Sequence, residues 1–234
     1  MERPRIALLN AAHDPAETAR NFRREVDADL VEYHVAGGQV PERVDADLDG
    51  AVLTGSQSSV YWDDAWIDAT REWTAAAVDR DLPILGVCFG HQLLADALGG
   101  AVESMGEYEI GYRPVTRVAD DRLLAGLPAE FTVFTTHSDA VTSLPAGAEL
   151  LAENDYGVHA FRRGNAYGVQ FHPEYDVPTA ERVTKRKDDL DPDRMAAALD
   201  GITPENYAAA CEAKRLFENF RSIVVSAAST AAAD

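Results

Sequence analysis

The sequence is poor in cysteine. Among its 234 residues there are two, Cys88 and Cys211. Two cysteines are too few for a disulfide framework of the kind that stabilises small secreted domains. The number suits a reducing compartment, in which at least one of them is available as a free thiol.

Long apolar stretches are also missing. No run approaches the roughly 20 apolar residues that a membrane-spanning helix needs. The first residues lead only to a short apolar run at residues 6–9, which does not resemble a signal peptide. We therefore expect a soluble, cytoplasmic protein that does not bind membranes.

Positive charge is scarce. The formal net charge is −19 with a pI near 4.6, and Lys185, Lys187 and Lys214 are the lysines of the chain. Such a balance disfavours attraction to nucleic acids and to anionic membrane surfaces. It resembles the acidic, lysine-poor surfaces of proteins from high-salt cytoplasms, where salt screens the self-repulsion of the surface. We treat this halophilic character as a hypothesis.

Short apolar and β-branched runs alternate with helical patterns in the first hundred residues, which is typical of a parallel sheet flanked by helices. Asp14 and Asp64 are the predicted N-caps of two of the helices. The predicted strands are residues 5–10, 30–35, 50–54 and 83–87, and the predicted helices are residues 15–27, 65–80 and 89–98.

The pattern changes after residue 100. Strand-like segments dominate, at residues 111–118, 131–135, 157–162 and 166–171, which indicates a mixed sheet within the same α/β core. We expect one domain over residues 1–175. Residues 176–234 are predicted to form a mainly helical extension packed on that domain, with a last helix from about 203 to 226 and a frayed tail at 227–234.

Cys88 lies in a Gly-x-Cys-x-Gly pattern between a predicted strand and a predicted helix. This arrangement is a nucleophile elbow with cysteine in place of serine. The glycines permit a sharp turn, and the N-terminus of the following helix directs its free N–H groups toward the sulfur. The elbow predicts a reactive thiol, although a small buried cysteine is an equally good interpretation of this pattern alone.

His172 ends a second strand and is followed by Pro173 and Glu174. Proline cannot continue a strand ladder, so the histidine is expected where a side chain can turn into a site. A base for the thiol and a carboxylate to orient that base are thus supplied together. We predict Cys88, His172 and Glu174 to be a catalytic triad.

Residues 86–92 (Gly-Val-Cys-Phe-Gly-His-Gln) and 168–174 (Gly-Val-Gln-Phe-His-Pro-Glu) resemble the motifs of class I glutamine amidotransferases, closest to the glutaminase portion of GMP synthase. Weaker matches lie in the family's order at residues 52–59, 109–112 and 136–139. The resemblance covers about residues 5–175 and implies a flavodoxin-like fold. It also implies that Cys88 forms a γ-glutamyl thioester, that His172 transfers the proton and that Glu174 orients His172.

The same resemblance implies further roles for residues at matching positions. The backbone N–H groups of Ser56 and Phe89 would form the oxyanion hole. Substrate binding falls to Gly55, Gln92, His137, Ser138 and Asp139; Gln92 is four residues after Cys88 and so lies on the same side of its helix. Ser56 and Ser138 depart from the family, which has glycine at both positions.

We expect neither a metal nor another cofactor. His13, His34 and His159 have no cysteine or carboxylate cluster at metal-ligand spacing in the sequence. The loop at residues 54–59 lacks the lysine of a P-loop, so no ATP site is expected.

These observations leave several functions open. The first is a glutaminase that releases ammonia from glutamine for a separate ATP-dependent synthetase such as GMP synthase. The second is a free-standing hydrolase of γ-glutamyl amides or peptides. The third is a regulatory or binding homologue that has lost turnover, which the intact triad disfavours. Another cysteine hydrolase or chaperone that shares the strand–cysteine–helix elbow is the main competitor at the level of the fold, and it is not expected to carry His172, Pro173 and Glu174.

Overall fold

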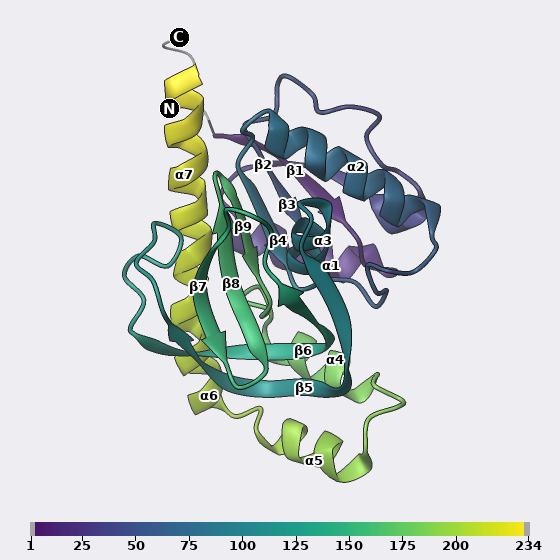
Figure 1. The fold of residues 1–234 in the computed structure, drawn as a ribbon. Coiled ribbons are helices and arrows are strands. Elements are labelled where there is room, and N and C mark those ends of the chain that lie inside the picture. The colour runs from purple at the N-terminus through teal and green to yellow at the C-terminus, as the bar shows by residue number, and fades with distance from the viewer. Residues whose placement is uncertain (1–2, 232–234) are drawn as a thin grey trace.

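A mixed sheet forms the centre of the protein (Figure 1). The structure, a computed structural model, describes residues 3–231. Within that range the sheet has nine strands in the order β2-β1-β3-β4-β9-β8-β7-β5-β6. Its parallel part consists of β1 (Arg5–Asn10), β2 (Asp29–His34), β3 (Gly50–Leu53), β4 (Ile84–Val87) and β9 (Ala166–Val169). The predicted α/β fold class with a mixed sheet is confirmed.

The antiparallel part of the sheet differs most from the prediction. It contains β5 (Ala101–Arg117), β6 (Glu130–Ser143), β7 (Glu149–Asn154) and β8 (Gly157–Arg163). β5 is about twice and β6 nearly three times as long as expected, because residues outside the predicted segments, such as Val102 and Val141, also pair with one another. β7 was not predicted.

Helices α1 (Pro15–Glu25) and α7 (Arg215–Ala231) cover one face of the parallel strands, and α2 (Ala65–Asp79) and α3 (Phe89–Ala97) cover the other. The helices α4 (Val177–Lys185), α5 (Pro192–Asp200) and α6 (Pro204–Ala210) lie against β5 and β6. Two 3-10 turns are η1 (Val35–Gly37) and η2 (Cys211–Lys214). Asp14 and Asp64 occupy the predicted N-cap positions, but neither side chain accepts a capping hydrogen bond. The side chains of Asp176, Asp191 and Thr203 do cap α4, α5 and α6.

The side chains of β1 show how the two faces are divided. Ile6 and Leu8 point into a core that includes α1 and α7, whereas Ala7 and Leu9 point into a core that includes α2 and α3. Successive residues of a strand face opposite sides, so a fully apolar strand needs cover on both. Figure 1 shows α7 along one side of the sheet and α2 on the other.

The end of the chain corrects two expectations. The single helix expected from about residue 203 is divided into α6, η2 and α7. The frayed tail predicted to start at residue 227 is wrong up to residue 231, because α7 continues to Ala231; residues 232–234 lie outside the described residues. Apolar side chains of α7 such as Phe220 and Val224 belong to the same core as Ile6.

The parallel strands point their carboxyl ends at one edge of the sheet, the usual position of sites in open α/β folds. The segments that follow β1, β3, β4 and β9 meet there and include Ala12, Gly55, Cys88 and His172. None of the helices among residues 3–231 has the length and apolar composition needed to cross a membrane.

Candidate active site

Cys88 stands at a strained turn between β4 and α3. Its backbone has φ 53° and ψ −106°, a region that side chains with a Cβ rarely adopt. The flanking glycines make the turn possible: a Cβ on Gly86 would lie 2.3 Å from the carbonyl oxygen of Gly90, and one on Gly90 would lie 2.3 Å from that of Leu53. The Cys88 N–H donates to Val169 O at 2.9 Å, which ties the turn to β9. The geometry is that of the predicted elbow.

His172 and Glu174 come together beyond the end of β9. The Nδ1 atom of His172 lies 2.8 Å from Oε1 of Glu174, and the two residues are 4% and 2% exposed. The backbone N–H of His172 donates to Phe134 O at 2.9 Å, and the His172 ring stacks on Tyr175 with centroids 4.1 Å apart. These contacts hold the imidazole in one orientation.

Charges around His172 determine its protonation. Burial acts to lower the pKa of His172, but the charges of Glu174 and Cys88 and its hydrogen bonds to both raise it to about 10. The imidazole is therefore positively charged at neutral pH. A positively charged imidazole beside Cys88 can stabilise negative charge on the sulfur and carries a proton that a leaving group could accept.

A cavity of about 110 Å³ opens beside the triad. Cys88, His172 and Glu174 line it together with Gly55 and Ser56 of the loop after β3. A Cβ on Gly55 would lie 2.9 Å from Cε1 of His172, so glycine allows this loop to approach the base closely.

The two N–H groups predicted to form the oxyanion hole have no acceptor of their own in the described chain. Within residues 3–231, neither the Ser56 N–H nor the Phe89 N–H donates to another group. Ser56 replaces a family glycine without requiring a positive φ, and its hydroxyl accepts the Ser58 N–H at 3.2 Å within the loop. Ser138 does not have a positive φ either. Both serines thus fit the backbone at their positions.

The other predicted substrate-binding residues have different partners. The amide nitrogen of Gln92 donates to Asp139 O at 2.9 Å and to Gln170 Oε1 at 3.1 Å. The Asp139 carboxylate accepts hydrogen bonds from Ser59 (2.5 Å) and Tyr61 (3.0 Å) in the loop after β3. Of residues 3–231, those that line the cavity do not include Gln92, His137, Ser138 or Asp139. Contact with substrate remains a prediction for these four, and the bonds of Gln92 and Asp139 support a positioning role.

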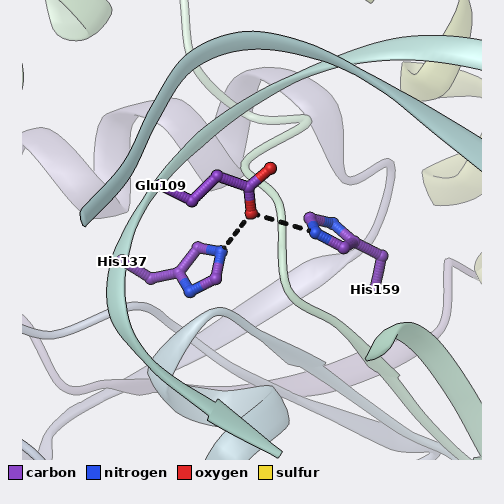
Figure 2. Close-up of side chains that lie close together, drawn as sticks. All are labelled: Glu109, His137 and His159. Carbon is purple, nitrogen blue, oxygen red and sulfur yellow. Dashed lines mark hydrogen bonds and ion pairs between the residues drawn. The ribbon is translucent and has the colours of Figure 1, made fainter. Parts of the chain in front are cut away.

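His137 belongs to a buried cluster with Glu109 and His159 (Figure 2). Oε2 of Glu109 lies 2.7 Å from Nε2 of His137 and 3.0 Å from Nε2 of His159, and Oε1 accepts from Asn154 at 2.6 Å. Burial acts to raise the pKa of Glu109, but the hydrogen bonds and charges of the two histidines lower it to about 2. Two histidines and a carboxylate are a possible metal-ligand set. In this structure both oxygens of the Glu109 carboxylate accept hydrogen bonds, from N–H groups of His137, His159 and Asn154.

The sequence alone did not reveal this cluster, because Glu109, the carboxylate that His159 contacts, lies 50 residues away along the chain. The three residues come from β5, β6 and β8, so their spacing carries no metal-ligand pattern. Glu109 lies directly opposite His137 in the β5–β6 ladder. A correct prediction of the β5–β6 pairing from the sequence would have placed Glu109 and His137 side by side.

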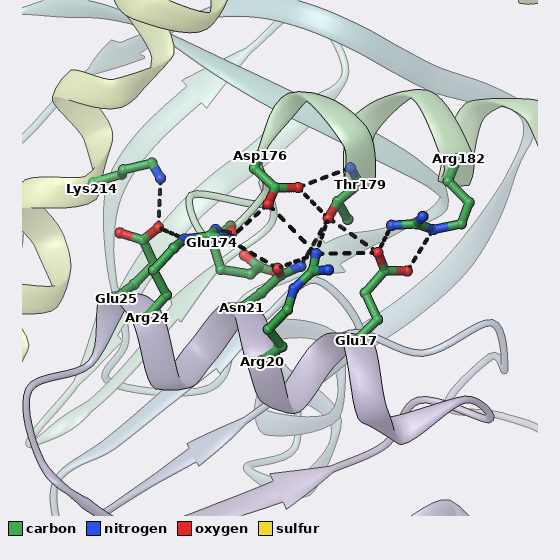
Figure 3. A network of polar contacts seen from close by, with 10 residues as sticks. All are labelled: Glu17, Arg20, Asn21, Arg24, Glu25, Glu174, Asp176, Thr179, Arg182 and Lys214. Atoms are coloured by element: carbon green, nitrogen blue, oxygen red, sulfur yellow. Dashed lines mark hydrogen bonds and ion pairs between the residues drawn. The ribbon is translucent and has the colours of Figure 1, made fainter.

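Arg24 of α1 holds the segment that carries Glu174 (Figure 3). Its guanidinium donates to the carbonyl oxygen of Glu174 and, at 2.8 Å, to the carboxylate of Asp176. Asp176 also accepts the N–H of Thr179 at 2.9 Å and caps α4. Burial acts to raise the pKa of Asp176, but these bonds and the nearby arginines keep it below its usual value. No sequence motif indicated this role for Arg24.

The cavity also has lining residues that were not predicted. Val183, Arg186 and Lys187 approach it from α4 and the turn that follows. They lie beyond residue 175, in the segment whose position relative to the triad could not be read from the sequence.

Comparisons with known proteins agree with this geometry. The family model "Glutamine amidotransferase class-I" matches residues 18–187, more than half of the chain. A GMP synthase (glutamine-hydrolysing) of Thermomicrobium roseum is 42% identical over 126 residues, which cover 53% of this chain and 23% of that protein. The corresponding GMP synthase of Staphylococcus aureus is 38% identical over 128 residues, 53% of this chain and 24% of that protein. The match thus spans about a quarter of the length of these relatives.

Solved structures match nearly the whole chain. A glutamine amidotransferase from Thermotoga maritima aligns with a TM-score of 0.80 at 23% identity, covering 94% of this chain and 99% of the other. A glutamine amidotransferase from Methylobacillus flagellatus aligns with a TM-score of 0.76 at 20% identity, covering 97% of this chain and 96% of the other. At these identities the likeness concerns the fold.

Proposed function

The chain belongs to the class I glutamine amidotransferase family, and from that premise we propose that it hydrolyses the side-chain amide of glutamine to glutamate and ammonia. The observation that carries this proposal is the convergence of Cys88, His172 and Glu174 on one cavity, with His172 hydrogen-bonded to Glu174 at 2.8 Å.

In the first half of the reaction the Cys88 thiolate attacks the amide carbon of glutamine. Negative charge develops on the amide oxygen, and the N–H groups of Ser56 and Phe89 are the proposed donors to it. The imidazolium of His172 then gives its proton to the amide nitrogen, the carbon–nitrogen bond breaks, and ammonia leaves. The γ-glutamyl group remains on Cys88 as a thioester.

In the second half His172, now neutral, takes a proton from water, which attacks the thioester carbon. The carbon–sulfur bond breaks, glutamate leaves, and the thiolate and imidazolium pair is restored. Glu174 accepts from Nδ1 of His172 throughout, which keeps the other ring nitrogen toward the sulfur and stabilises the charged ring. Such a catalyst needs a reduced thiol, and a reducing cytoplasm is the location that we propose.

We propose that the ammonia is used by a separate ATP-dependent synthetase. The two relatives described above are GMP synthases, and the chain matches about a quarter of their length. GMP synthase is thus our guide to the partner. The chain itself shows no lysine-containing phosphate loop that would activate an acceptor.

A free-standing γ-glutamyl amide or peptide hydrolase is the second candidate. The observation in its favour is that Val183, Arg186 and Lys187 line the cavity, so residues after 175 shape the substrate site as well as the surface around it.

We propose that residues 176–234 are an extension of the domain formed by residues 1–175. The apolar contacts of α7 with the core support the packing of this extension on the domain.

The first test is release of ammonia and glutamate from glutamine by the purified protein. We expect Cys88→Ala to abolish it, whereas Cys211→Ser, a change at the other free cysteine, should retain it. Activity that persists in Cys88→Ala would exclude this nucleophile. Assays of γ-glutamyl dipeptides, with and without a co-purified synthetase, distinguish the two candidate functions.

A further inference from the structure

The cavity beside Cys88 carries two cations that the triad does not use. Arg186 and Lys187 line it from the turn after α4. The charged residues on its other side are His172 and Glu174, which are bonded to each other. Arg186 and Lys187 are thus the charged residues among the described lining that lie outside the proposed triad.

Lys187 differs from Lys185 and Lys214 in the partners of its ammonium. Its ammonium lies 4.8 Å from the centroid of the Tyr108 ring, and the Tyr108 hydroxyl donates to Asp189 at 3.0 Å. Over residues 3–231, no carboxylate lies within 4.0 Å of this ammonium. A ring face positions a cation but accepts none of its hydrogen bonds in the way a carboxylate does.

The other two lysines provide a contrast. Lys185 pairs with Glu181 at 3.1 Å, and Lys214 pairs with Glu25 at 2.6 Å. The chain has 40 acidic residues against 21 basic ones, so carboxylate partners are abundant. A half-buried ammonium without one, at the wall of a catalytic cavity, has hydrogen-bond donors available for an anion that binds there.

The electrostatics agree with this position. Burial lowers the pKa of Lys187, and the charges of Cys88 and Asp189 act in the opposite direction. Lys187 and Cys88 line the same cavity. Because the whole chain is strongly negative, an anionic group that enters the cavity needs a local positive charge of this kind.

We propose that Lys187, together with Arg186, binds the α-carboxylate of the γ-glutamyl substrate while the amide carbon lies at Cys88. This inference rests on the proposed function, because it takes the substrate to be a γ-glutamyl compound. It assigns substrate recognition to the segment after α4. Substrates without a free α-carboxylate are discriminated against at this subsite.

A first experiment tests the charge without requiring turnover. In a Cys211→Ser background, the rate at which Cys88 is alkylated is measured with iodoacetate, an anion, and with iodoacetamide, its neutral counterpart. Lys187→Met should lower the iodoacetate to iodoacetamide rate ratio about fivefold, because one nearby positive charge is removed. Lys185→Met is the matched control, since Lys185 does not line the cavity, and should leave the ratio unchanged.

A second experiment tests recognition of the α-carboxylate. KM is measured for glutamine and for glutamine α-amide, in which a neutral amide replaces that carboxylate. Lys187→Met should raise KM for glutamine about tenfold or more and leave KM for the α-amide nearly unchanged, because one charged hydrogen bond is lost. Lys187→Arg should restore most of the affinity for glutamine. An equal rise in KM for both substrates, or no rise for either, would overturn the proposed subsite.

The two experiments separate the subsite from the proposed function. A lowered alkylation ratio without hydrolysis of any γ-glutamyl amide would support an anion subsite at Lys187 and overturn the proposed function. An unchanged ratio in an active enzyme would overturn the subsite alone.

Discussion

The Nδ1 atom of His172 lies 2.8 Å from Oε1 of Glu174, and both side chains are almost completely buried. The carboxylate is a main reason why the pKa of His172 rises to about 10 despite burial. The proposed chemistry depends on this relationship, since it keeps the base charged and oriented toward Cys88.

Replacing Glu174 with glutamine removes the charge and keeps an oxygen that can accept from Nδ1. We expect kcat to fall about 100-fold, because proton transfer by His172 is impaired. The pKa of His172 should fall, so the loss of activity at high pH moves from near pH 10 to lower pH. A pH profile of kcat/KM for both proteins measures this shift.

Glu181→Gln is the control for that variant, because Glu181 lies on α4 and pairs with Lys185. Its profile should match that of the unchanged protein. An identical high-pH limb in Glu174→Gln would contradict the role given to this carboxylate.

Arg24 is predicted to be a positioning residue. Arg24→Met removes the hydrogen bonds to Glu174 O and to Asp176, so Glu174, the proposed orienting carboxylate, loses part of its support. We expect kcat to fall about tenfold with KM little changed. Arg23→Met, which removes an exposed pair with Glu32, should leave kcat as it was. Equal kinetics in the two variants would argue against positioning by Arg24.

The buried cluster predicts how stability depends on pH. Glu109 has a pKa of about 2 in the folded protein, against an ordinary value of 4.5. The folded state therefore binds this proton less readily than the unfolded state, and the resulting stabilisation, about 3 kcal/mol, is present above pH 4.5 and lost as the pH falls toward 2. Denaturant unfolding of the unchanged protein and of Glu109→Gln between pH 7 and pH 3 measures it. A constant difference between them over this range would contradict the prediction.

The acidic surface predicts a dependence on salt. With a net charge of −19, self-repulsion opposes folding at low ionic strength, and salt screens it. The thermal unfolding midpoint should rise from low salt to molar salt. Salt also screens the exposed ion pairs, such as Arg3 with Asp27, so a falling midpoint would show that these pairs matter more than the repulsion.

The parts of the fold that could be predicted from the sequence are those with strong local signals. β1, β4 and α3 follow from apolar runs and from the glycines around Cys88. The proposed triad rests on two short motifs, whose residues line one cavity in the structure. β7 was missed because its residues, Glu-Leu-Leu-Ala-Glu-Asn, include helix formers and alternate poorly. Its pairing with β8 and β5 is a tertiary effect.

The parts of the site that the sequence did not predict depend on contacts between distant segments. Lys187 reaches the cavity because α4 folds back beside α1, where Glu17 binds Arg182 at 2.8 Å. His159 approaches Glu109 across strands whose order in the sheet is not the order in the chain. No local sequence pattern predicts that Lys187 lines the cavity or that His159 lies beside Glu109.

The central claim is that Cys88 forms a thioester with the γ-glutamyl group of glutamine. Rapid acid quenching of the enzyme during turnover, followed by mass spectrometry of the peptide that contains Cys88, tests it most directly. We predict a mass increase of one γ-glutamyl group on Cys88, enriched when deacylation is slowed and absent in Cys88→Ala. Continued release of ammonia with no such adduct, or with the adduct on Cys211, would contradict it.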